Sequence, residues 1–137
     1  MTTLDENSPY AYVLCGDHFA RTSRVAHHDD IVIGFVMGYP VPDRPDTLFV
    51  WQVGVDARAR GQGLALRLIE EVWVHNPAFR FLESTVAPSN EASDRLFRAF
   101  AARHRAEVRT SLAYGVTCFP GDHEAEIGYT IGPIDRC

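Results

Sequence analysis

A run of glycines and arginines between a strand and a helix constrains this chain more than any other feature. Residues 48–55 are nearly all apolar, as expected for a strand that is covered on both faces. They lead into residues 58–65, where positions 61 and 63 are glycines. From Gly63 onward, apolar residues recur at helical spacing as far as Asn76. A strand, a glycine turn and a helix in this order are typical of a site that holds a phosphate group.

The chemistry of residues 58–65 agrees with that interpretation. Glycine allows a ligand to approach the backbone closely and adopts positive φ without strain. The first turn of a helix offers unpaired N–H groups and the positive end of the helix dipole. Arg58 and Arg60 add positive charge. Neither a Gly-Lys-Ser/Thr nor a G-x-G-x-x-G pattern follows, so Walker-type and dinucleotide-binding loops are not indicated, and an ordinary tight turn is the plain alternative.

Composition predicts one domain that spans residues 1–137. The chain has 46% hydrophobic and 11% aromatic residues, which suits a globular core. Eighteen acidic and thirteen basic residues give a net charge of -5, which argues against a nucleic-acid partner. Cys15, Cys118 and Cys137 are far apart and predict free thiols in the cytoplasm. No segment has the pattern of a signal peptide or a membrane span.

The other segments alternate between strand and helix patterns. Helices are expected over residues 8–15, 63–76 and 90–103, and strands over 24–27, 31–39, 48–55, 79–86, around 114–119, and 124–131. Three prolines predict a loop over residues 40–46. Strands and helices in one mixed sheet indicate an α/β fold, which some schemes call α+β.

Residues 58–65 resemble the Gln/Arg-x-x-Gly-x-Gly/Ala signature of the GNAT acetyltransferases, which Arg58, Gly61 and Gly63 match. The resemblance implies the GNAT fold, a central and mostly antiparallel mixed sheet flanked by helices, and acetyl-CoA as cosubstrate. It also implies that the loop grips the CoA pyrophosphate. The loop residues concerned are Arg58, Arg60, Gly61, Gln62, Gly63, Leu64 and Ala65.

The same resemblance covers the strand before the loop and the next helix. It implies that the strand ending Val53-Gly54-Val55 bulges so that pantetheine pairs with its edge, and it makes Val53 and Gly54 candidates to hold the thioester carbonyl. Asn90 matches a side chain that contacts CoA, and a plain N-cap explains it equally well. Phe97 stands where many members have a tyrosine as general acid. Either the acid comes from elsewhere, or the thiolate leaves unaided.

Longer blocks resemble the L-2,4-diaminobutyrate acetyltransferases of ectoine synthesis. The blocks are residues 4–12, 44–53, 81–93 and 121–127. This resemblance implies transfer of the acetyl group to the 4-amino group of diaminobutyrate, which serves osmoprotection through a compatible solute. It implies a homodimer that docks through its last two strands. It also implies a substrate site made of Asp5, Tyr10, Trp51, His123 and Glu126.

The chemistry of a diamine can be compared with those residue types. One ammonium group must lose its proton before attack, which costs roughly 4 kcal/mol at neutral pH. Asp5 and Glu126 suit recognition of ammonium groups, and either can act as the base, directly or through water. Trp51 can cover the site and contact an ammonium through its ring face, so it joins them as a candidate catalytic residue. Strand alternation predicts that Trp51 shares a face with Val53.

Each of these residues also has a plainer interpretation. Trp51 in an apolar strand suits a core, and Asp5 and Glu126 suit solvated surface charges. His123 and Glu126 have metal-ligand spacing, but no third ligand is evident, so no metal is expected. Two alternative functions stay open: a GNAT enzyme of another amine, or a CoA-binding module without activity.

GNAT proteins ordinarily begin with a strand and a helix that the sequence before Leu4 does not provide. The expected fold therefore lacks that first strand and helix. The strand over residues 24–27 should then lie at an edge of the sheet, with unpaired backbone groups.

Overall fold

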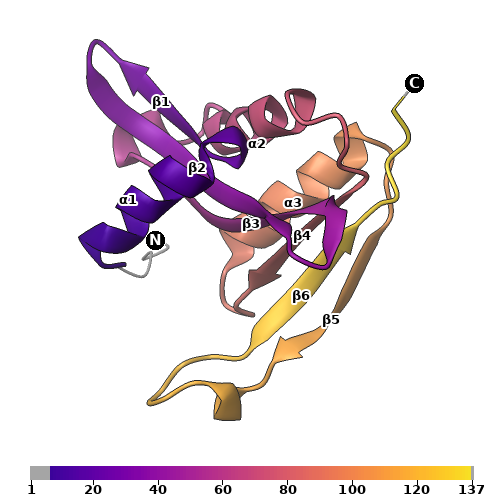
Figure 1. The fold of residues 1–137 in the computed structure, drawn as a ribbon. Helices are drawn as coiled ribbons and strands as arrows, with labels where there is room; N and C mark the ends of the chain where they lie inside the picture. The colour runs from indigo at the N-terminus through magenta and orange to yellow at the C-terminus, as the bar shows by residue number, and fades with distance from the viewer. Residues whose placement is uncertain (1–6, 137) are drawn as a thin grey trace.

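Within residues 7–136, which the computed structural model describes, six strands form one sheet in the order β1-β2-β3-β4-β6-β5 (Figure 1). The strands are β1 (Arg24–His28), β2 (Ile31–Val41), β3 (Arg44–Val55), β4 (Phe81–Val86), β5 (Val108–Tyr114) and β6 (Glu126–Ile131). Neighbouring strands are antiparallel except β3 and β4, which are parallel. The mixed and mostly antiparallel sheet that the sequence predicted is confirmed, and β1 lies at one edge of it.

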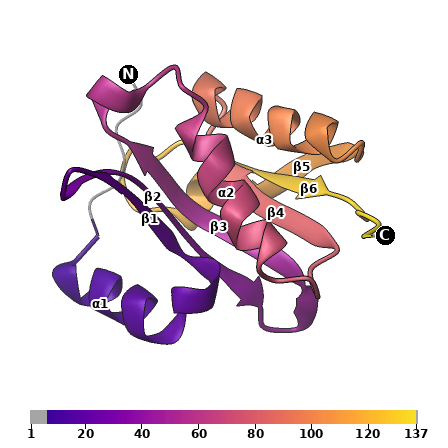
Figure 2. The same ribbon diagram turned by 90° about the horizontal axis from the view of Figure 1, so that it is seen from above.

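Helices cover both faces of this sheet. Helix α1 (Pro9–His18) lies on one face, and α2 (Leu64–Val74) and α3 (Glu91–Arg103) lie on the other (Figure 2). Short 3-10 helices are η1 (Ala20–Thr22), η2 (Ala57–Ala59) and η3 (Val116–Cys118). Ser8 caps α1 by accepting a hydrogen bond from the Ala11 amide, and Pro9 stands in the first turn, where its missing N–H costs nothing.

The hydrophobic core lies between the sheet and the pair α2 and α3. Phe100 and Ile69 are fully buried there, and Trp73 meets Phe100 edge-on with ring centroids 5.4 Å apart. Helix α1 contributes Cys15 as its one buried residue among those described, so that face of the sheet is covered more thinly.

Two predicted segments are wrong. Residues 40–46 are not a loop, because β2 runs to Val41 and β3 begins at Arg44, directly opposite it. Pro40 has no backbone N–H, and none is needed there. Strand β1 begins at Arg24, opposite Val36, so this end of β2 has no β1 neighbour that would accept a hydrogen bond.

The last hairpin is the second correction. Strand β5 covers Val108–Tyr114, and the residues after it form η3 rather than the strand expected around 114–119. Six of the seven residues of β5 are exposed, since β5 is the outer strand of the sheet. A strand with no buried face has no alternating pattern, so periodicity could not locate it.

Candidate active site

The glycine loop forms an open turn into α2. Gly61 and Gly63 have φ of +78° and +70°, a region that side chains with a Cβ rarely adopt. A Cβ built on either glycine would have no described heavy atom within 4 Å, so the space beside the loop is open. Gly63 is the N-cap of α2, and none of the described side chains caps that helix. The first turn of α2 therefore presents N–H groups toward the open side, which suits a phosphate.

Arg58 and Asp56 form an exposed ion pair just before the glycines. The Arg58 Nε donates to Asp56 Oδ1 at 3.0 Å, and the Arg58 amide donates to the same oxygen at 2.9 Å. These hydrogen bonds from Arg58 lower the pKa of Asp56 to about 2. Arg60 is exposed beside them. A bound pyrophosphate would therefore compete with Asp56 for Arg58.

Strands β3 and β4 separate close to this loop. Their parallel pairing consists of three described positions, the last of which joins Phe49 to Glu83. Beyond it, β3 continues along β2 to Val55, and β4 continues along β6 to Val86. The two strands thus open toward their C-terminal ends, on the side where the glycine loop follows β3.

Strand β3 bulges at Trp51. Gly38 of β2 lies opposite Val50, and Met37 lies opposite Gln52, which leaves Trp51 as the extra residue. The expected bulge is present, but it lies two residues before Val53. The bulge also changes which residues share a face.

Trp51 and Val53 do not lie on the same face, contrary to the alternation argument. Val50 belongs to the core and Val53 packs against it, although the two are three residues apart. Between them, Gln52 points to the opposite face, where its Oε1 accepts from the Asn7 side chain at 2.9 Å. Trp51, 41% exposed, is not part of the core either. The bulge breaks the period of two, which is the physical reason for the error.

Glu126 lies on the same face of the sheet as Trp51. Ile127, Tyr129 and Ile131 all pack into the core beneath α2 and α3, so Glu126, one residue before Ile127, points to the α1 face. Ile127 lies opposite Val86, at the end of β4. Trp51 and Glu126 therefore lie on opposite sides of the gap between β3 and β4. Glu126 is half-buried.

His123 precedes β6 in a loop that fixes its ring. Its Nδ1 lies 2.5 Å from the Glu124 carbonyl oxygen, and a carbonyl only accepts, so Nδ1 carries the proton and Nε2 is left as an acceptor in the neutral ring. Phe119 stacks on the ring with centroids 3.9 Å apart. The ring of His123 is thus held in one orientation and one tautomer.

The start of α1 carries another of the predicted substrate residues, Tyr10. The bond from Asn7 to Gln52 holds the segment before α1 against β3, next to Trp51. Tyr10, in the first turn of α1, is 68% exposed. Asp5 lies outside the described residues. The structure therefore places Tyr10, Trp51 and Glu126 on one face, whereas Asp5 stays a prediction.

Helix α3 is attached to β6 through a tyrosine. Asn90 is the N-cap of α3 and its Oδ1 accepts from the Ser93 amide at 3.1 Å, so the plain capping role is present. Phe97 is 3% exposed and lies against the Tyr129 ring. The Tyr129 hydroxyl donates to Asp94 at 2.6 Å, which lowers the pKa of Asp94, while burial raises the pKa of Tyr129. The Tyr129 hydroxyl donates its proton to Asp94. It therefore does not replace the general acid that a tyrosine at position 97 would supply.

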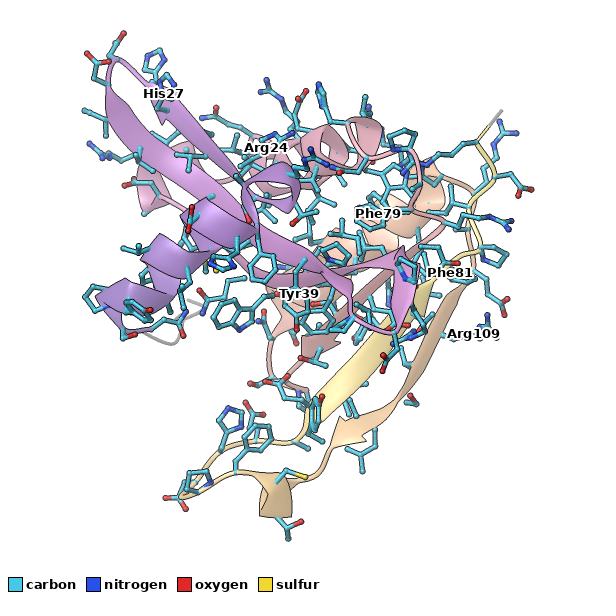
Figure 3. The ribbon with its side chains drawn as sticks, in the orientation of Figure 1. Arg24, His27, Tyr39, Phe79, Phe81 and Arg109 are labelled. Atoms are coloured by element: carbon cyan, nitrogen blue, oxygen red, sulfur yellow. The ribbon has the colours of Figure 1, made fainter. Side chains whose placement is uncertain are left out.

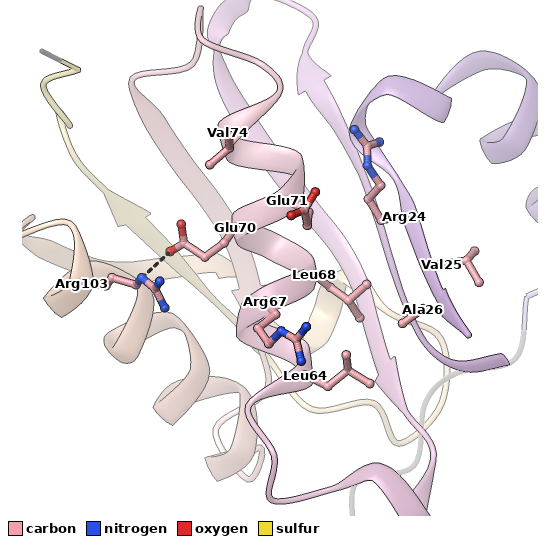
Figure 4. A pocket seen from close by; sticks show the side chains of 10 residues that line it. All are labelled: Arg24, Val25, Ala26, Leu64, Arg67, Leu68, Glu70, Glu71, Val74 and Arg103. Carbon is pink, nitrogen blue, oxygen red and sulfur yellow. Dashed lines mark ion pairs between the residues drawn. The ribbon is translucent and has the colours of Figure 1, made fainter. Parts of the chain in front are cut away.

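Two of the grooves on the surface of residues 7–136 lie on different parts of the sheet. One, of about 290 Å³, lies on the α1 face between the aromatic rings of Tyr39 (Figure 3) and Phe49 on one side and Thr85 and Tyr114 on the other. The other, of about 470 Å³, lies between α2 and β1 (Figure 4). Neither is lined by Trp51, His123 or Glu126. The smaller groove adjoins the proposed amine side, and the larger one is remote from it.

Sequence reasoning missed three supporting residues: Gln52, Ser84 and Phe119. Gln52 and Ser84 are buried polar residues inside strands, 8% and 5% exposed. A polar residue among buried strand positions is the signal that could have singled them out, because such a group needs a partner. Within the described residues no group of three or more His, Cys, Asp or Glu side chains could hold a metal ion. None of the described helices is long and apolar enough to cross a membrane.

The chain is similar to known acetyltransferases over most of its length. The model of the acetyltransferase (GNAT) family matches residues 3–101. The L-2,4-diaminobutyric acid acetyltransferase of Streptomyces coelicolor is 43% identical over 136 residues, which are 96% of this chain and 80% of that protein. The enzyme of that name from Marinococcus halophilus is 42% identical over 138 residues, covering 98% of this chain and 80% of its own length.

A solved structure is similar in three dimensions as well. The diaminobutyrate acetyltransferase of Paenibacillus lautus, in complex with its substrate L-2,4-diaminobutyric acid and coenzyme A, superposes with a TM-score of 0.92 and 39% identity. The match covers 98% of this chain and 83% of that one. The chain belongs to the GNAT family of acetyltransferases and, within it, to the L-2,4-diaminobutyrate acetyltransferases.

Proposed function

We propose that this chain transfers the acetyl group of acetyl-CoA to the 4-amino group of L-2,4-diaminobutyrate, giving N4-acetyl-diaminobutyrate. The observation that carries the proposal is the near-complete match in sequence and fold to an enzyme that holds this diamine and coenzyme A. The open glycine turn and the gap between β3 and β4 support it, because they provide a phosphate site beside a free strand edge.

We assign CoA to the face of that gap that carries α2 and α3. The pyrophosphate is held by the loop and by the first turn of α2, where N–H groups and the helix dipole favour an anion. Pantetheine pairs with the free edge of β3, and the amide of Val53 or Gly54 polarises the thioester carbonyl. The residues assigned to CoA are Val53, Gly54, Val55, Arg58, Arg60, Gly61, Gln62, Gly63, Leu64, Ala65 and Asn90.

We assign the diamine to the α1 face. Glu126 and Asp5 attract the ammonium groups, and one of them takes the proton that the 4-amine must lose. Trp51 covers the substrate with its ring, and Tyr10 and His123 complete the wall. The neutral amine then attacks the thioester carbon, a C–N bond forms, and the C–S bond breaks as CoA leaves as a thiolate. The nitrogen loses a second proton as the amide forms, and this proton neutralises the thiolate, directly or through water, while the first proton leaves the carboxylate for solvent.

The product belongs to ectoine synthesis, so the role proposed for the chain is osmoprotection. The cytoplasm is the compartment that suits it. Acetyl-CoA is made there, and Cys15 and Cys118 are both free in the structure, as expected under reducing conditions.

A homodimer is the assembly that we propose, formed through β5 and β6. Leu112, Tyr114 and Val116 are 64%, 52% and 58% exposed and follow one another along the outer hairpin. Sedimentation should give twice the chain mass of 15.3 kDa. Leu112→Lys should shift the protein to the monomer, and a wild-type monomer at micromolar concentration would contradict the assembly.

The function is tested with a panel of amines. Protein incubated with acetyl-CoA and L-2,4-diaminobutyrate, lysine, spermidine or an aminoglycoside should release thiol fastest with diaminobutyrate, and mass spectrometry should find the acetyl group on N4. Equal rates across the panel would refute the substrate but leave the class of enzyme. CoA binding by calorimetry without any turnover would instead favour an inactive CoA-binding module.

A further inference from the structure

We propose that the hydroxyl of Ser84 ends the pairing of β3 with β4 and so holds open the strand edge that receives CoA. The inference rests on the proposed function for the identity of the ligand. Ser84 lines the smaller groove but is not among the residues assigned above to the loop or to the diamine, so it acts as a positioning residue.

A buried hydrogen bond joins the two strands at the point where they separate. The Ser84 Oγ donates to the carbonyl oxygen of Val50 at 2.8 Å. Ser84 and Val50 are 5% and 2% exposed, so water does not compete for this bond. A buried carbonyl without a partner is costly, and this serine supplies the partner from its side chain.

The register shows what the hydroxyl replaces. Phe49 and Glu83 are the last residues paired in the ladder, and Val50 and Ser84 come directly after them. In a continuing parallel ladder a backbone N–H of β4 would satisfy the carbonyl on this edge of β3. Here the serine side chain occupies that carbonyl, so the ladder can end without leaving it unpaired.

Both strands continue with other neighbours from this point. Ser84 lies opposite Tyr129 in the ladder with β6, which runs on to Val86. On the other side, the bulge at Trp51 follows Val50 immediately and turns β3 along β2. The hydroxyl and the bulge therefore act at adjacent residues. The hydroxyl satisfies the Val50 carbonyl, where the pairing with β4 ends, and the bulge at Trp51 changes the direction of β3. Residues 51–55 of β3 are left with an edge that β4 does not cover.

Replacing the hydroxyl tests the inference. In Ser84→Ala the Val50 carbonyl loses its donor, and β4 can satisfy it by moving closer and extending the ladder into the gap. We expect the Kd of CoA and the KM of acetyl-CoA to rise about tenfold, with the KM of the diamine unchanged. Ser84→Thr keeps the donor and should restore most of the affinity. A folded Ser84→Ala protein that binds CoA like the wild type would overturn the inference.

Thr22 offers a matched control. Its Oγ1 donates to the Gly38 carbonyl of β2 at 2.6 Å, and the residue is 3% exposed, so it is also a buried hydroxyl on a strand carbonyl. Thr22→Val should lower the melting temperature about as much as Ser84→Ala while leaving the Kd of CoA unchanged. Equal losses of CoA affinity in both variants would mean general loosening of the sheet and would overturn the inference.

Amide hydrogen exchange without CoA separates this inference from the proposed function. In Ser84→Ala, protection should increase at the amide of Thr85, which would donate to the Val50 carbonyl as the ladder extends. Unchanged exchange there would refute the role of Ser84 even in an active enzyme. A wild type that binds no CoA would contradict the proposed function and leave the exchange result as a valid test of the strand opening.

Discussion

The glycine loop and the amine face are built in opposite ways. The loop is one continuous stretch, residues 58–65, and its shape follows from local backbone preferences: positive φ at Gly61 and Gly63, then a helix start. The proposed amine face takes residues from the start of α1, from the bulge of β3 and from the beginning of β6. The difference implies that a single change in the loop should abolish CoA binding. A change on the amine face should only lower the rate, because several segments position the substrate there.

The largest effect is expected in the loop. Proline requires φ near −65°, and Gly63 has φ of +70°, so Gly63→Pro should abolish CoA binding, with the Kd measured by calorimetry raised more than about 100-fold. Gly115 has φ of −72° and accepts proline, so Gly115→Pro is the matched control and should bind CoA normally. Normal affinity in folded Gly63→Pro would show that the loop is only a turn.

On the amine face, Glu126→Gln should lower kcat about 100-fold while the Kd of CoA stays within a factor of about two, because the change removes a proton acceptor but not the phosphate site. Trp51→Ala should cost about as much through lost positioning of the substrate. Glu124→Gln is the control, since the Glu124 carboxylate is exposed and accepts from Ser89. Unchanged rates in both Glu126→Gln and Trp51→Ala would refute the assignment of the amine site.

A smaller effect is expected on α3. Phe97→Tyr adds a hydroxyl at a position that is 3% exposed, which should cost roughly 1–3 kcal/mol of folding free energy, seen as a lower melting temperature. If the thiolate leaves unaided, kcat should change less than about threefold. Phe100→Tyr, at a fully buried position of the same helix, is the control for stability alone. A tenfold rise of kcat in Phe97→Tyr would show that protonation of the thiolate limits the rate.

The smallest effect concerns the charge beside the loop. Asp56→Asn removes a carboxylate that competes with the pyrophosphate for Arg58, so the KM of acetyl-CoA should fall about twofold. At high salt the fall in KM should be smaller, because salt screens the exposed charges. The pKa of Asp56 is lowered to about 2. Its contribution to stability is therefore complete above the ordinary pKa of about 3.8 and is lost only as the pH falls through about 2.

The KM of acetyl-CoA for Asp56→Asn, divided by that for the wild type, should accordingly stay constant between about pH 5 and pH 9. A ratio that changed within that range would mean that Asp56 titrates there and is not held by Arg58. Asp30→Asn, which makes the same change of charge at the tip of the β1–β2 hairpin, should leave the KM of acetyl-CoA unchanged.

Local sequence patterns predicted the elements well where each pattern reports burial or a cap. Residues 90–103 form α3 with Asn90 as its cap, and residues 31–39 lie within β2, as expected. The errors fall where a pattern carries no such signal. Strand β5 is exposed on both faces, and Pro40 lies where β2 has no β1 neighbour, so the N–H that proline lacks is not needed there.

The sequence by itself determined the family, the fold class and the glycine turn before α2, because glycine positions and helix starts depend on neighbours in the chain. Only the tertiary structure decided the bulge at Trp51, the face on which Trp51 lies, and the bond from Ser84 to Val50. These features depend on where β4 leaves β3, and that is set by pairing between segments more than thirty residues apart in sequence. A residue's own neighbours in the chain do not encode the point at which two distant strands separate.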